Sequence, residues 1–204
     1  MARDENMPFP LGQTYFGGDT TVIDPVVGAS LEGQEYVIED DNLSNGTIGA
    51  NVNRSGRRRK VRVVRNLNAA ALLGGQIAKF SLAGTLVGDI VGKVNGLVAT
   101  AADKGAPVDE FLGVNGCLQN DLCYVVIDGL AQVSTDSAGT TTVAIGGVVV
   151  PGATTAGRVV AQDTTQTGAN LFNQIQNAIG RAATAVAAAS TTLTVDVGAT
   201  HRVG

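Results

Sequence analysis

The sequence has no tryptophan and one histidine, and aromatic residues make up only 4% of its 204 residues. The single histidine, His201, lies near the C-terminus. Because we expect this end of the chain to be frayed, we expect His201 to take no part in a Ser-His-Asp triad or a Cys-His pair, and one histidine is too few for a histidine-rich metal site. We therefore expect no enzyme and no cofactor. The shortage of large rings also means that a core must come from Val, Ile, Leu and Ala.

Cysteine and long apolar runs are scarce as well. Cys117 and Cys123 are six residues apart, with no further cysteine or histidine at zinc-ligand spacing. We expect buried free thiols, and a disulfide between the two remains an alternative. No run reaches the roughly 18 apolar residues of a membrane span, so we expect no membrane partner. Residues 1–5 are charged rather than apolar, and we expect no secretory leader.

Charges of opposite sign are segregated into two neighbouring stretches. Residues 1–53 hold one base and nine acids, whereas residues 54–65 hold seven bases and no acid. Such a basic run can meet carboxylates, on a partner or on its own chain, or it can meet phosphates. It lacks the interleaved aromatics of base-stacking proteins, so we expect no dedicated nucleic-acid binding. The nearest acids precede the run: Glu35, Glu39, Asp40 and Asp41.

We expect the basic side chains to be exposed. On that basis, replacing Arg57, Arg58 and Arg59 with Ser should slow attachment to a partner and leave the fold intact. Another charged pair, Asp109-Glu110, consists of adjacent residues that point apart in an extended loop. We expect a capped or solvated loop here rather than carboxylates that share acid-base work.

Glycine is abundant, with 27 residues, and it separates short β-branched runs. Residues 76–82, 86–94, 122–127 and 130–133 read as strands, as do 141–145 and 148–150. Asn95-Gly96, Asp128-Gly129 and Gly146-Gly147 are typical of hairpin turns between them. Residues 100–121 read as a long loop. This pattern predicts an all-β barrel or sandwich.

The two ends of the chain have a different character. Residues 1–34 contain small apolar clusters, including Phe9 and Tyr15-Phe16, that cannot form a core alone, so we expect an arm that packs on another surface. Short strands are predicted at 35–39 and 61–66, and the basic residues 57–60 lead into the second of these. Helical spacing of apolar residues predicts a helix over about 170–189. Clean alternation then predicts a closing strand over about 191–198.

Three parts of the sequence resemble the capsid cement, or head decoration, proteins of tailed bacteriophages. Residues 61–68 (VRVVRNLN) with Leu72-Leu73 are similar to the start of that family's domain. Residues 107–112 (PVDEFL) and 120–126 (NDLCYVV) are similar to its middle. Residues 179–182 (IGRA), the following alanine-rich run and the closing TLTVDV resemble its ending. Cys123 stands where an aromatic residue is common in the family, and Gly113 where proline or a small residue is frequent.

The resemblance implies a mainly β protein: a compact β-barrel or β-tulip-like domain over 61–204, with one C-terminal helix. Residues 1–60 would form an extended N-terminal arm and basic loop. It also implies a homotrimer on the outer capsid surface of the virion that clamps neighbouring major capsid subunits. We expect the contacts with the capsid or between subunits to involve nine residues: Phe9, Tyr15, Phe16, Arg57, Arg58, Arg59, Val108, Phe111 and Leu112.

Two other functions remain open from the sequence. One is a structural adhesin of a phage tail or fibre, which longer β-repeats would favour. The other is a nucleic-acid-binding β-barrel, which depends only on residues 54–65 and would bind duplex DNA in a salt-sensitive way.

Overall fold

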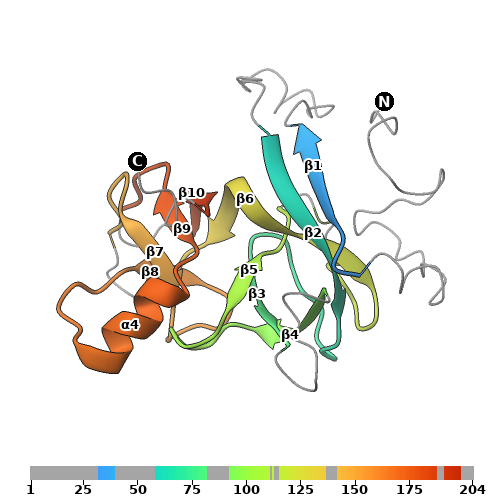
Figure 1. The fold of residues 1–204 in the computed structure, drawn as a ribbon, viewed down its shortest axis with the longest axis horizontal. Helices are drawn as coiled ribbons and strands as arrows, with labels where there is room; N and C mark the ends of the chain where they lie inside the picture. Colours follow the sequence, from blue (N-terminus) through green and yellow to red (C-terminus); the bar gives the residue numbers. More distant parts are fainter. Residues whose placement is uncertain are drawn as a thin grey trace.

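The computed structural model describes residues 32–39, 58–81, 92–110, 112, 115–136, 142–187 and 191–198. Their strands join into one ten-stranded sheet, accompanied by one helix in this part of the chain (Figure 1). The mainly β class is therefore confirmed. The elements are β1 (Glu35–Glu39), β2 (Arg58–Asn66), β3 (Ile77–Phe80), β4 (Lys93–Leu97), β5 (Gly105–Pro107), β6 (Leu122–Ser134), β7 (Val148–Pro151), β8 (Val159–Ala161), α4 (Gly168–Gln176), β9 (Gly180–Ala182) and β10 (Thr192–Val197).

Strand β6 joins the two halves of this sheet. The strand order is β5-β3-β4-β2-β6-β10-β9-β7-β8, and β1 pairs with β2 outside this path. The first half of β6 pairs with β2, from Leu122 opposite Arg65 to Asp128 opposite Lys60. Its second half pairs with β10, beginning with Gly129 opposite Val197. Figure 1 accordingly shows two groups of strands, one on each side of β6.

Each end of the strand order returns to β6 through an isolated bridge. Val108, directly after β5, pairs with Val125, and Val159 of β8 pairs with Thr135, directly after β6. Backbone hydrogen bonds accompany both contacts, from Asp109 N to Tyr124 O and from Asp136 N to Val159 O, each 3.0 Å long. The paired strands that the structure describes do not close into a continuous ring. Instead, each half of the sheet curves back to β6 through one bridge.

Apolar side chains are buried on both faces of β2 and β6, although β2 also carries basic residues. Because successive side chains point to opposite faces, Val61 and Val63 enter one core cluster and Val64 enters the other. Along β6, Tyr124 and Val125 are divided between the clusters in the same way. Complete burial of a valine side chain contributes about 1.5–3 kcal/mol.

Two of the predicted hairpin turns are wrong. Asn95 and Gly96 lie inside β4, and Asp128 and Gly129 lie inside β6. Both glycines do adopt positive φ, 86° and 95°. The pairing register shifts beside each site, between β3 and β4 and between β2 and β6. The positive φ serves a bulge that bends a continuous strand, rather than a turn that ends it.

The predicted helix is too long. It ends at Gln176, and Gly180–Ala182 instead forms β9 against β10. At Gly180 an added Cβ would lie 2.2 Å from the carbonyl oxygen of Asp196, so the two backbones approach closely. The apolar residues beyond the helix, Ile179, Ala182 and Val186, belong to the sheet core.

The remaining predicted elements are placed as follows. Strand 35–39 corresponds to β1, strand 61–66 to β2, which begins earlier at Arg58, and the closing strand to β10. The predicted loop 100–121 contains β5. The predicted arm falls outside the described residues up to Leu31, whereas β1, although within the range 1–60, is part of the sheet. The division of domains at residue 60 remains a prediction.

Candidate interaction surface

Antiparallel pairing of β1 with β2 places acidic side chains beside the basic run. Glu35 lies opposite Arg62 in the register. Its carboxylate accepts a hydrogen bond of 3.1 Å from Arg62 Nε and also pairs with Lys60 Nζ. Hydrogen bonds from Lys60 and Arg62 hold the pKa of Glu35 below its ordinary value of 4.5.

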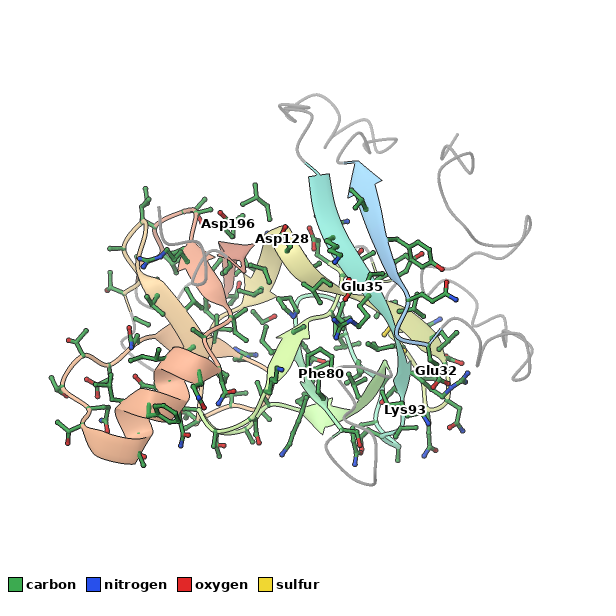
Figure 2. All side chains as sticks on the ribbon, viewed as in Figure 1. Glu32, Glu35, Phe80, Lys93, Asp128 and Asp196 are labelled. Carbon is green, nitrogen blue, oxygen red and sulfur yellow. The ribbon has the colours of Figure 1, made fainter. Side chains whose placement is uncertain are left out.

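A second group of charges lies where the chain enters β1, around Glu32. Arg65 Nε donates to Glu32 Oε1, and Lys93 Nζ lies 3.8 Å from Glu32 Oε2. Figure 2 shows Glu32 and Lys93 next to each other. Backbone bonds reinforce the contact, because Gly33 N donates to Val63 O over 2.9 Å. The segment before β1 is thus attached to β2 by both side chains and backbone.

The third group is buried. Arg59 is 7% exposed and Asp109 only 1%. Arg59 Nη2 lies 3.3 Å from Asp109 Oδ1, and Arg59 Nη1 lies 3.0 Å from Glu110 Oε1. Burial raises the pKa of Glu110 above its ordinary value of 4.5, although Arg59 acts in the opposite direction. Of the two expected alternatives, a capped or a solvated loop, the solvated one is wrong, because the loop folds against β2 and both carboxylates pair with Arg59.

Four of the seven bases of the run therefore contact carboxylates of the same chain: Arg59, Lys60, Arg62 and Arg65. For these four, the interpretation as intramolecular neutralisation is confirmed. Sequence reasoning identified Glu35 because it lies close in the chain. It missed Asp109 and Glu110, about fifty residues away. The expectation that replacing Arg57, Arg58 and Arg59 leaves the fold intact stays a prediction, but Arg59 is buried and paired, which argues against it.

The structure describes three of the nine predicted contact side chains, and all three are buried. Val108 is 0% and Leu112 9% exposed, both within a core cluster, and Arg59 lies in the buried charge group. Arg58 is described only as backbone of β2. The other five, Phe9, Tyr15, Phe16, Arg57 and Phe111, fall outside the described residues.

The described surface offers other apolar side chains that sequence reasoning did not select. Phe172 and Ile175 of α4 are 57% and 55% exposed, and Ile145 is 71% exposed. The helical spacing of Phe172 and Ile175 is visible in the sequence, but the same residues would also fit a helix packed on the core. Only the placement of α4 shows that this face is open.

A groove of about 550 Å³ lies where β6 changes partners. Its lining includes the bulged residues Ile127 and Asp128 and the basic side chains Lys60, Arg62 and Lys104. Glu35 also lines it, so charges of both signs meet there. Among the described residues, no group of three or more His, Cys, Asp or Glu side chains has a geometry that could hold a metal ion.

The two cysteines are free and buried, so the prediction of free thiols is confirmed. A hydrogen bond with Cys117, together with burial, raises the pKa of the Cys123 thiol. Since the thiolate is the reactive form, this environment keeps Cys123 unreactive.

No protein-family model matches the sequence, and no curated protein matches it. Two solved structures are similar in part. One is the N-terminal base of the head fibre gp8.5 of bacteriophage phi29, with a TM-score of 0.37 and 13% identity, covering 67% of this chain and 92% of that one. The other is the capsid of Myoviridae phage XM1, with a TM-score of 0.34 and 17% identity, covering 66% of this chain and 81% of that one. These scores are too low for either structure to supply a function. No helix in the described part of the chain has the length and hydropathy of a membrane-crossing segment.

Proposed function

We propose that this chain is a structural protein of a tailed-phage virion. In this proposal it binds the outer surface of the capsid as a homotrimer and stabilises the contacts between major capsid subunits. The sequence resemblance to capsid cement proteins is the basis of the proposal, and the arrangement of the resembling segments supports it.

The supporting observation is that the resembling segments pair with one another. Residues 61–65 of β2 lie antiparallel to residues 122–126 of β6. The segment 107–112 is attached to the same two strands, through the bridge from Val108 to Val125 and the ion pair of Asp109 with Arg59. The last two segments, 180–182 and 195–197, pair as β9 and β10. The segments that resemble the family are therefore far apart in the sequence, but they contact one another in the folded sheet.

The N-terminal arm completes the proposal. Its apolar residues, among them Phe9, Tyr15 and Phe16, would contact a neighbouring subunit or the capsid. Deletion of residues 1–30 stops short of Glu32, which pairs with Arg65. The truncated protein should therefore keep its sheet and bind shells more weakly. If it binds shells as tightly as the full chain does, the arm is not a contact.

The decisive experiment mixes the purified protein with phage shells that lack it. Expanded and unexpanded shells are sedimented separately, and the pelleted shells are imaged by negative-stain microscopy. We expect binding to the outside of expanded shells and increased resistance of those shells to heat. Failure to bind either type of shell would overturn the proposal.

A parallel measurement tests nucleic-acid binding. The ion pairs of the basic run leave fewer cations available to phosphates, so duplex affinity at physiological salt should be weak. Tight binding that falls steeply as salt rises would favour the nucleic-acid alternative.

A further inference from the structure

Two buried thiols lie in contact beneath one turn of the chain. Cys117 and Cys123 are 2% and 1% exposed, and both belong to the same core cluster. A hydrogen bond joins their side chains, and Cys117 Sγ itself donates to Asp121 O over 3.5 Å. The two sulfur atoms are therefore neighbours, and only residues 118–122 separate the cysteines in the chain.

The turn between the cysteines is held against the end of β2 by hydrogen bonds. Asp121 N donates to Leu118 O over 3.1 Å, and Asn120 N donates to Asn66 O over 2.7 Å. The side-chain amide of Asn66 in return donates to Cys117 O over 2.8 Å. Exposed turns held in this way open locally at a small cost in free energy. A covalent link between the two cysteines would join both ends of the turn and restrict that opening.

We propose that Cys117 and Cys123 form a redox-sensitive cross-link, in which hydrogen peroxide converts the two thiols into a disulfide that fixes this turn on β2. In the first step, the thiolate of one cysteine attacks a peroxide oxygen. An S–O bond forms, the O–O bond breaks, and the departing hydroxide takes the thiol proton to become water. In the second step, the other sulfur attacks the resulting sulfenic acid. An S–S bond forms, the S–O bond breaks, and hydroxide leaves with the second thiol proton as water. Two electrons pass from the sulfur atoms to the peroxide.

Cys117 is the cysteine that reacts first. The hydrogen bond with Cys117 and burial raise the pKa of the Cys123 thiol, so Cys123 stays protonated and attacks an outside reagent slowly. Cys117 borders the turn, where Leu118 is 43% exposed, and opening of the turn brings a small oxidant to its sulfur. Cys123 already lies beside the sulfenic acid that forms there, and this proximity offsets its low reactivity.

On the proposed function, the cross-link would form after assembly of the virion. Thiols stay reduced in the cytosol of a bacterium, whereas disulfides persist on the surface of a virion. A virion protein passes from the first environment to the second. Only this timing rests on the proposed function, because the cross-link itself is a property of the single chain.

The test incubates the purified full chain with hydrogen peroxide and alkylates the remaining thiols in urea. A protease that cleaves before aspartate yields the fragments 109–120 and 121–127, each with one cysteine. We expect these fragments of one chain to stay joined until dithiothreitol is added, with the mass of two hydrogens lost. Met1 and Met7 lie outside both fragments, so their oxidation does not disturb the reading. Thiols that stay free, thiols oxidised to sulfonic acid, or links between different chains would overturn the proposal.

Single variants test the order of the steps. In Cys123→Ser, the sulfenic-acid reagent dimedone should label residue 117. In the matched variant Cys117→Ser, residue 123 should stay unlabelled. Labelling of residue 123 alone would overturn the assignment of Cys117 as the first thiol to react.

Hydrogen exchange tests whether the link fixes the turn. In the oxidised wild type the amide of Asn120, which donates to Asn66 O, should exchange at least about tenfold more slowly than in the reduced form. Equal exchange would overturn this role. The two proposals also fail separately. A chain that forms the link but ignores expanded shells refutes the capsid function alone, and a shell-binding chain that never forms the link refutes the cross-link alone.

Discussion

Arg59 lies between two carboxylates in a region from which most water is excluded. Its guanidinium contacts Asp109 and Glu110, and Asp109 is almost completely buried. A buried ion pair adds little net stability, because both charges have lost their hydration. Removal of one partner is nevertheless strongly destabilising, since the other charge stays buried and uncompensated.

Replacement of Arg59 by Ser should therefore lower the free energy of unfolding by about 3–5 kcal/mol. Lys60→Ser is the matched control on the next residue, because its ammonium pairs with Glu35 while the side chain is 43% exposed. Exposed pairs contribute about 0–1 kcal/mol, so the control should remain close to the wild type. Urea unfolding of both variants measures the difference, and equal effects would contradict the buried role of Arg59.

Glu110 should make the protein less stable as pH rises. Its folded pKa is raised above 4.5 by burial, so the protonated form favours folding. That contribution is present below the unfolded pKa and is lost as pH rises through the folded pKa. In Glu110→Gln the side chain stays neutral, so the free energy of unfolding should decline less than that of the wild type over this window. Urea unfolding in steps from about pH 4 to about pH 7 measures it.

Glu35 should show the opposite sign. Its folded pKa lies below 4.5 because Lys60 and Arg62 donate to it. The resulting stability is present above the unfolded pKa and is lost as pH falls through the folded pKa. In Glu35→Gln this decrease in the free energy of unfolding at acid pH should be absent. The difference from the wild type should be small and salt-sensitive, because the pair is partly exposed. The same pH dependence in both variants would refute the distinction between a buried and an exposed carboxylate.

At the scale of elements, glycine has two separate roles in the strands. Gly180 allows β9 to approach β10, since an added Cβ would lie 2.2 Å from Asp196 O. Gly96 has space around it, with the nearest atom, Asn68 Nδ2, at 3.6 Å, but it adopts φ of 86°. A side chain at Gly180 is therefore excluded by contact with β10, whereas one at Gly96 is disfavoured by the backbone conformation.

Alanine at each position should separate these roles. Gly180→Ala should force β9 from β10 and lower stability by about 1–3 kcal/mol, as overpacking does. Gly96→Ala should lower it by about 1–2 kcal/mol through left-handed strain. Gly96→Asn should recover part of that loss because Asn tolerates positive φ, whereas Gly180→Asn should be worse than Gly180→Ala. Thermal unfolding of the four variants checks this order, and rescue of Gly180 by Asn would contradict it.

The same elements show what could be predicted from sequence. Strand β10 is predictable from its strict alternation, and the first half of β6 from its apolar run, because burial imposes these patterns. The bulges in β4 and β6 were mistaken for turns, since a glycine with positive φ fits both and only the partner strand decides. The helix was extended through Ile179 and Ala182 because their spacing also fits a helix, whereas pairing with β10 makes them a strand. The ion pairs of Arg59 with Asp109 and Glu110 could not be predicted, because a local sequence pattern does not show which distant loop packs against β2.

At the scale of the whole molecule, the sharing of β6 determines how the sheet unfolds. Both halves bend back to this strand, and one core cluster includes Val63 from the first half and Val195 from the second. Neither half can lose its strands without exposing side chains that the other half covers. We therefore expect one cooperative transition for the two halves.

Tyrosine fluorescence and far-UV circular dichroism can test this coupling, because Tyr36 and Tyr124 both lie in the first half, with ring centroids 6.2 Å apart. A Tyr15→Phe background removes the remaining tyrosine, and the chain has no tryptophan. During urea unfolding the two signals should change together. Val195→Ala, a fully buried residue of the second half, should shift both midpoints equally while lowering stability by about 2 kcal/mol. Val63→Ala is the matched variant in the first half and should act in the same way. If Val195→Ala moves the dichroism curve and leaves the tyrosine curve in place, the halves unfold separately and β6 does not couple them.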